Sequence, residues 1–237
     1  MSTIDAGAPV SSETAGAPRS LGRRILDTFV SPGELFSRLG PTPPWVDVLL
    51  IAAALTTLAM ALIPASVWMN MAHETIANME PKQRAAVTPE TIANVSRITG
   101  PLGAFFVTFV TAFIVAGLLK LVFGVFMKGE ATFAEYRSVV SHAALISALG
   151  TLVTLPVWIA TGDITTQLSA GLLAPELPKG VLSSLLGALS VFGLWWMAVI
   201  AMGVSTVNRR ISFGASAGII FGIYLAVAAL AGLVAAR

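Results

Sequence analysis

Five long apolar runs fill this chain and restrict its fold more than any other feature of the sequence. They cover residues 45–68, 101–127, 139–161, 181–207 and 212–236. Each is about as long as the roughly 20 residues that a helix needs to cross ~30 Å of hydrocarbon. None shows the alternation of barrel strands, and a backbone in lipid must satisfy its own polar groups. We therefore predict an all-α fold, a polytopic membrane bundle of five transmembrane helices.

The composition agrees with a membrane protein and excludes several other classes. Charged residues make up 11% of the chain and the mean hydropathy is +0.84, whereas soluble domains carry about a quarter charged residues. The net charge is only +2 and no basic stripe is present, so we predict no nucleic-acid partner. The chain contains no cysteine, which excludes disulfides, thiolate metal sites and cysteine nucleophiles.

The chain divides into a tail, a lead-in and a membrane domain. Residues 1–20 are small and polar and contain proline, so we predict a disordered tail. Residues 21–44 are predicted to form a cytoplasmic amphipathic lead-in, since Leu21, Ile25 and Phe29 recur at four-residue spacing. Residues 45–237 then form the five-span membrane domain.

The second half of the lead-in carries a helix-start signal. Ser31-Pro32-Gly33-Glu34 is a capping-box pattern with proline at the first helical position, and it predicts a second short helix. Two interpretations stay open: the lead-in lies along the lipid interface, or it packs on the end of the bundle. The residues that define it are Phe29, Pro32, Glu34, Leu35 and Phe36.

The basic residues beside the runs predict the orientation. About eight lysines and arginines fall on the side of the N-terminus and about five on the other side. The first forty residues hold no apolar stretch of signal-peptide length, so the first span is expected to insert as an uncleaved anchor. We predict a multi-pass protein of the bacterial cytoplasmic membrane, with the N-terminus in the cytoplasm and the C-terminus outside.

A few ionisable residues lie in or beside the runs, all at one predicted depth. Such residues are costly in lipid and point to function by default. They are either interfacial anchors or the lining of a water-filled cytoplasmic vestibule, with an Asp47–Lys120 pair and a titrating His142. The candidate polar cluster comprises Asp47, Lys120, His142, Arg209 and Arg210.

The last run carries small residues at four-residue spacing: Gly214, Gly218, Gly222 and Ala226. Membrane helices associate where small residues let their backbones approach closely. The stripe is therefore a helix-packing face, either inside the bundle or between two copies of the chain.

Catalytic and metal-binding motifs are absent from the sequence. It contains no Gly-x-Ser-x-Gly, no His-Glu-x-x-His and no phosphate-binding glycine loop. The two histidines, His73 and His142, fall on opposite sides of the membrane in the predicted topology. We therefore predict no enzyme, no cofactor and no metal.

Four stretches of the sequence resemble one known family: FVSPGELF at 29–36, GEATFAEY at 129–136, LP at 155–156, and FGLW at 192–195 leading to IAMG at 200–203. Together with the five runs they make residues 25–237 similar to the bacterial branch of the Yip domain family. Its relatives are the eukaryotic Ypt/Rab-interacting membrane proteins. The resemblance implies a five-span protein without known catalysis. The chain lacks the Asp-Leu-Tyr-Gly-Pro segment of the eukaryotic members, so the resemblance lends no support to GTPase binding.

These features together predict a non-enzymatic scaffold or accessory factor. It would serve membrane organisation or the assembly of another membrane complex. Its expected partners are the lipid bilayer and either such a complex or a second copy of the chain. The alternative hypothesis is a small-solute or ion transporter or channel that uses the cytoplasmic vestibule.

Overall fold

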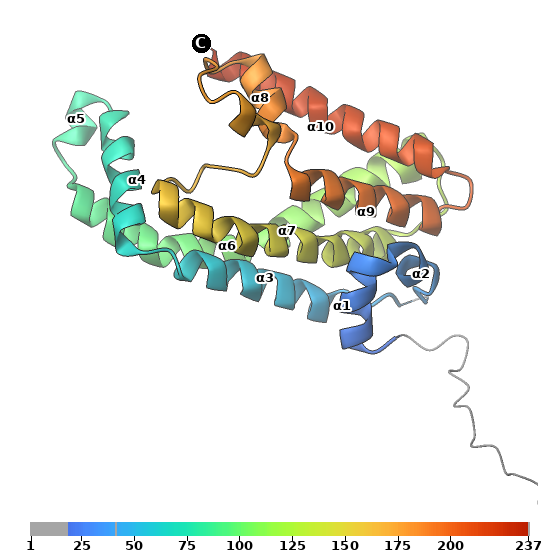
Figure 1. Ribbon diagram of the computed structural model, residues 1–237. Helices are drawn as coiled ribbons and strands as arrows, with labels where there is room; N and C mark the ends of the chain where they lie inside the picture. The colour runs from blue at the N-terminus through green and yellow to red at the C-terminus, as the bar shows by residue number, and fades with distance from the viewer. Residues whose placement is uncertain (1–18, 41, 237) are drawn as a thin grey trace, which may run out of the picture.

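The computed structural model describes residues 19–40 and 42–236, so most of the predicted tail lies outside the described residues. Helices form all the regular secondary structure in this part of the chain. The long helices run side by side (Figure 1). Helix α3 (Val46–Ala61) packs against α6 (Pro89–Leu119) and α7 (Phe133–Thr161). On the other side of α7 lies α9 (Val191–Val207), which in turn packs against α10 (Phe213–Ala235).

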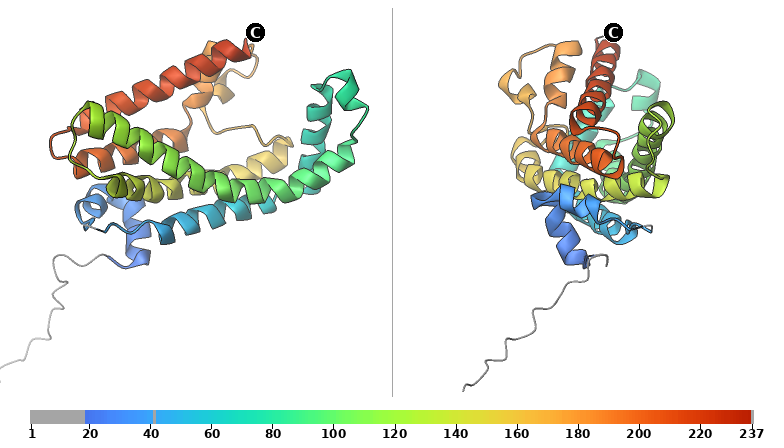
Figure 2. Two further views of the ribbon diagram at one scale, coloured as in Figure 1. Left: turned by 180° about the vertical axis from the view of Figure 1, so that it is seen from behind. Right: turned by 90° about the vertical axis from the view of Figure 1, so that its right-hand side faces the viewer.

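The two ends of the bundle differ. Helices α1 (Leu21–Val30) and α2 (Pro32–Ser37) cover one end, where the 208–212 turn also lies; we call it the lead-in end. Helices α4 (Ala65–Ala77) and α5 (Pro81–Arg84) stand at the opposite end, the far end. Figure 2 shows the same separation from behind. The described chain thus starts at one end of the bundle, and α10 finishes toward the other.

The lead-in contains two short helices, as predicted, but their junction differs from the predicted capping box. The Ser31 side chain makes no capping hydrogen bond. The Glu34 carboxylate instead accepts a hydrogen bond of 2.9 Å from Arg19. Helix α2 buries Leu35 and Phe36, each 2% exposed, against the bundle. For α2, the structure therefore matches the interpretation in which the lead-in packs on the end of the bundle.

The first predicted span, 45–68, is broken. Helix α3 ends at Ala61, and α4 leaves at 83° to it. Pro64 occupies the N-cap of α4; proline lacks the N–H that would continue the helical ladder, which explains the break. Trp68 consequently lies buried at 3% exposure and does not face lipid, since its ring packs on Gly100 of α6.

The second predicted span, 101–127, begins earlier than expected. Helix α6 starts at Pro89, runs through Pro101 and continues as a π-helix over Lys120–Phe126. The Thr88 hydroxyl caps its start by accepting from the Thr91 N–H. Residues 89–100 stay helical because Ala93 packs on α4 in a small apolar cluster. The third predicted span likewise starts earlier, at Phe133, where Thr132 and Glu135 form a capping box.

The fourth predicted span, 181–207, consists of two helices. Helix α8 (Val181–Ala188) and α9 are separated at Leu189 and Ser190, and both pack against α10. The predicted span 212–236 corresponds to α10, whose N-cap is Ser212.

Three helices are long and apolar enough to cross a membrane: Pro89–Phe126, α7 and α10. The bent α3–α4 pair is a fourth if it is one span, and α9 is a shorter apolar helix. Five crossings therefore remain a prediction. Only 11% of the most apolar window of α10 is buried, so most of that helix must be covered by lipid or a partner.

Candidate functional site

An ion pair between Arg24 and Asp47 ties α1 to the first turn of α3. The Arg24 Nη1 lies 3.2 Å from one carboxylate oxygen, and Nη2 contacts the other. This two-point contact is the geometry that a guanidinium makes best with a carboxylate. Arg24 is 6% exposed, whereas Leu26 on the same helix is 49% exposed. Helix α1 thus turns part of its charged face toward the bundle.

A second carboxylate on α1, that of Asp27, is fully buried and lies against two arginines. Arg19 contacts one oxygen, and the Arg23 Nε lies 3.1 Å from the other. The hydrogen bond to Asp27, and then the one to Glu34, raise the pKa of Arg19 above its ordinary value. Arg19 therefore remains charged and bridges α1 to α2. Sequence reasoning missed this network because one sequence does not show that α1 folds against α2 and α3.

A buried asparagine joins the two chain connections at the lead-in end. Asn208 is 1% exposed, and its side-chain oxygen accepts from the Ala131 N–H at 3.1 Å. Its amide nitrogen donates to the Val204 carbonyl at 2.8 Å and lies 3.0 Å from the Tyr136 hydroxyl. These bonds fix the α6–α7 connection to the turn between α9 and α10. From the sequence, Asn208 is expected only to be part of the short turn between the runs 181–207 and 212–236.

The predicted polar cluster does gather toward the lead-in end, but its members have separate partners. The Lys120 ammonium donates to the Ala131 carbonyl at 2.9 Å, so the predicted Asp47–Lys120 pair does not form. His142 is fully buried, and its Nδ1 lies 2.8 Å from the Ser138 carbonyl oxygen. Arg210 pairs with Glu130 at the exposed surface, and Arg209 is also exposed.

Arg137 lies among three aromatic rings near the start of α7. Its guanidinium carbon is 4.1 Å from the Trp45 ring centroid, 5.7 Å from that of Phe113 and 5.8 Å from that of Phe133. A cation over aromatic faces is attracted by the ring quadrupoles. Tryptophan and arginine side chains of this kind are also typical of the membrane–water boundary. This group therefore marks the depth at which the lead-in end would meet the headgroups.

The chemistry available at the lead-in end is that of internal attachment. Among the described residues, no group of three or more His, Cys, Asp or Glu side chains is placed to hold a metal ion. Asp47, Lys120 and Arg210 are each engaged within the chain, by Arg24, the Ala131 carbonyl and Glu130. The ring centroids of His142 and Phe36 are 6.2 Å apart. The vestibule hypothesis gains no support from this geometry, whereas docking of the lead-in on the bundle does.

The small-residue face of α10 does not pack inside the bundle. A Cβ atom built at Gly214, Gly218 or Gly222 would meet nothing within 4 Å outside its own helix. Ala226 continues the same face and is exposed. The interpretation of this face as an internal packing surface is therefore wrong, and contact with a helix of another chain stays a prediction.

Replacing Arg24 with methionine should loosen α1. The variant R24M leaves the Asp47 carboxylate without its two-point contact, and a hydrogen bond to a charged group contributes about 1.5–3 kcal/mol. We expect the undocked fraction of the lead-in to rise about tenfold or more. The chain has no cysteine, so the labelling rate of T28C, at a fully buried position, reports this fraction cleanly.

The matched control is R23M, because the Arg23 side chain is 53% exposed and shares its carboxylate with another arginine. Equal labelling of T28C in R24M and R23M would show that the Arg24–Asp47 pair does not hold α1 in place.

The family model described as the Yip1 domain matches residues 26–236 of the chain. No curated protein and no solved structure matches the chain.

Proposed function

Because the chain belongs to the Yip1 domain family, we propose that it is a scaffold or accessory factor for the assembly of another membrane complex. The family and the apolar helices make it an integral membrane protein, and the family is not known for enzymatic activity. In this proposal the protein acts by holding a partner helix in the bilayer and catalyses no reaction. The proposed function rests on one observation, the open small-residue face of α10.

The face of α10 has the form that membrane helices use for association. Its three glycines leave the backbone uncovered along about two turns, because a Cβ atom added at any of them would have no atom of another element of the chain within 4 Å. In lipid, such faces allow close van der Waals packing between backbones. Helix α6 adds a second uncovered apolar surface, where Phe106 is 64% and Ile114 57% exposed. Both helices can therefore contact neighbours in the membrane.

The proposed arrangement in the membrane has five passages: α3, α6, α7, the α8–α9 pair and α10. The lead-in end would face the cytoplasm, because most basic residues beside the spans belong to it. The far end, with α4 and α5, would lie outside. Single cysteines placed at Arg209 and at Gln83 test this, since a membrane-impermeant thiol reagent added to intact cells should label only the second. Labelling of the first position would reverse the orientation.

Substituting Gly218 with leucine should disrupt partner contact while leaving the fold intact. A cysteine introduced at Ala226, in the same stripe, should form a disulfide-linked product in membranes under mild oxidation. We expect G218L to lower its yield at least fivefold, because the leucine side chain keeps the two backbones apart. The mass of the product distinguishes a second copy of the chain from another membrane protein.

The control for this experiment is G103L. Gly103 is also on a membrane helix, and a Cβ atom added there would likewise meet nothing within 4 Å, but it lies on α6, away from the stripe. An unchanged yield in G218L, or an equal loss in G103L, would exclude the α10 face as the contact surface.

A further inference from the structure

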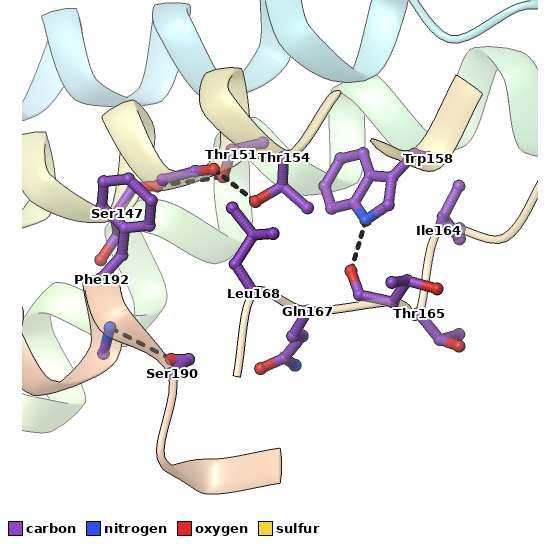
Figure 3. A pocket seen from close by; sticks show the side chains of 13 residues that line it. Ser147, Thr151, Thr154, Trp158, Ile164, Thr165, Gln167, Leu168, Ser190 and Phe192 are labelled. Atoms are coloured by element: carbon purple, nitrogen blue, oxygen red, sulfur yellow. Dashed lines mark hydrogen bonds between the residues drawn. The ribbon is translucent and has the colours of Figure 1, made fainter. Parts of the chain in front are cut away.

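A cavity of about 610 Å³ lies between α7, the connection that follows it and the start of α9 (Figure 3). Ser147, Thr151 and Thr154 line it from α7, and Thr165, Gln167 and Ser190 line it from the other side. None of its lining residues is ionisable. Two aromatic rings, those of Trp158 and Phe192, complete the wall (Figure 3).

The cavity lies near the middle of the bundle's length and is open to its surface, since Ser147, Thr165 and Gln167 are exposed. The break between α8 and α9 faces the middle of α10, since the Tyr224 hydroxyl donates to the Ala188 carbonyl at 3.1 Å. Phe192, just after the break, packs on Gly150 of α7. Helix α7 continues 11 residues beyond Gly150 to Thr161, or about 16 Å. The connection after α7 therefore turns back toward the bundle centre before it reaches the break.

The returning segment closes the helix break with backbone hydrogen bonds. The Ala170 N–H donates to the Leu189 carbonyl and the Val191 N–H to the Leu168 carbonyl, both at 3.1 Å. Non-helical backbone at membrane depth is tolerated only inside protein or beside a polar cavity. Over the described residues, the N–H groups of residues 166–168 have no acceptor in the chain. The segment thus offers free donors where discontinuous helices of transporters bind their ligands.

We propose that this cavity binds an uncharged, polyhydroxylated group with the chemistry of a sugar. The Thr151 and Thr154 hydroxyls donate to backbone carbonyls of α7 and leave their oxygens free to accept. Over the described residues, the side chains of Ser147 and Gln167 make no hydrogen bond, so they can both donate to and accept from the hydroxyls of such a ligand. An ion would find no opposite charge among the lining residues. The Trp158 N–H is already engaged by the Thr166 carbonyl at 2.8 Å, so the indole offers its apolar face. The size suits a small-molecule site, typically about 300–1,000 Å³.

This site is independent of the scaffold role, and its ligand has two possible sources: a free sugar or the headgroup of a glycolipid. The test uses S147C in the full chain, reconstituted in phosphatidylcholine vesicles. Ser147 is exposed within the cavity, and the chain contains no other thiol. A small water-soluble thiol reagent reports access. The probes are methyl glucoside in solution and monoglucosyl diacylglycerol in the bilayer, with unglycosylated diacylglycerol as the lipid control.

We expect one of the two sugar probes to slow labelling at least fivefold while diacylglycerol does not. Adding Q167L should abolish this protection. The Gln167 amide lines the cavity, is exposed and makes no hydrogen bond within the described chain, so it is free to bind the sugar hydroxyls. Q83L, at the other glutamine, should preserve it. Protection by the free sugar alone or by the glycolipid alone identifies the source.

Three results would overturn the proposal. Labelling that neither sugar probe slows would mean that the cavity holds only water. Reaction with a membrane-soluble maleimide but not with the water-soluble reagent would mean that acyl chains fill it. A variant that binds sugar as well as the parent despite Q167L and T151V together would also place the ligand elsewhere.

Discussion

Replacing Gly203 with leucine is expected to cause a large loss of stability. A Cβ at Gly203 would overlap the methyl groups of Val139 and come within 3.1 Å of the Phe36 ring. These neighbours are themselves buried at 0% and 2% exposure and have no space to move into. Overpacking by a few methylene groups costs about 1–3 kcal/mol, and we expect leucine at this helix crossing to lie at the top of that range.

We expect the melting temperature of G203L in detergent to fall by about 6–12 °C, the shift for ~3 kcal/mol in a chain of this size. Size-exclusion chromatography should show a smaller monodisperse fraction. The matched control is G218L, where the added side chain meets nothing within 4 Å. Equal destabilisation of both variants would show that the loss comes from replacing glycine in a helix and not from steric overlap with Val139 where α7 and α9 cross.

Replacing Asn208 with leucine should destabilise the lead-in end by about 3 kcal/mol. The substitution leaves the Ala131 N–H and the Tyr136 hydroxyl without their partner, and each unsatisfied buried group costs about 1–3 kcal/mol. Thermal unfolding in detergent measures the loss. Y136F removes only the hydroxyl and should cost about 1 kcal/mol.

The control for N208L is R209L, one residue along the same turn but exposed. The expected order of stability is parent and R209L highest, Y136F intermediate and N208L lowest. An N208L variant as stable as Y136F would mean that the Ala131 contact contributes nothing.

The sequence predicted those elements whose signals are local. The spacing of Thr132 and Glu135 is that of a capping box at the entry to the third run, and the structure contains this box. The family was also predicted from short motifs and is confirmed over residues 26–236. Pro64 gives the break between α3 and α4 a local cause. The hydropathy pattern, however, predicted one continuous span over 45–68, whereas α4 leaves α3 at 83°.

The remaining features depend on contacts between distant segments, and one sequence does not show these. The break between α8 and α9, at Leu189 and Ser190, contains neither proline nor glycine. It forms where residues 168 and 170, from the connection after α7, make hydrogen bonds with the backbone of residues 189 and 191. Asp47 forms an ion pair with Arg24 and not with Lys120, because α1 packs against α3. The cavity was missed for the same reason: its hydroxyls lie on two segments that the chain brings together only when it folds.

The apolar helices differ in length, and this has a consequence for the surrounding bilayer. From Pro101 to Phe126 the apolar part of α6 and its π-helix spans about 39 Å, whereas the 16 residues of α3 span about 24 Å. The hydrocarbon core is ~30 Å thick. In the proposed five-passage arrangement, this hydrophobic mismatch has opposite signs on two adjoining helices. Tilting of α6 and thinning of the lipid beside α3 relieve it together. The annulus around the protein is therefore thinner on one flank, and membranes of different thickness should accommodate the chain unequally.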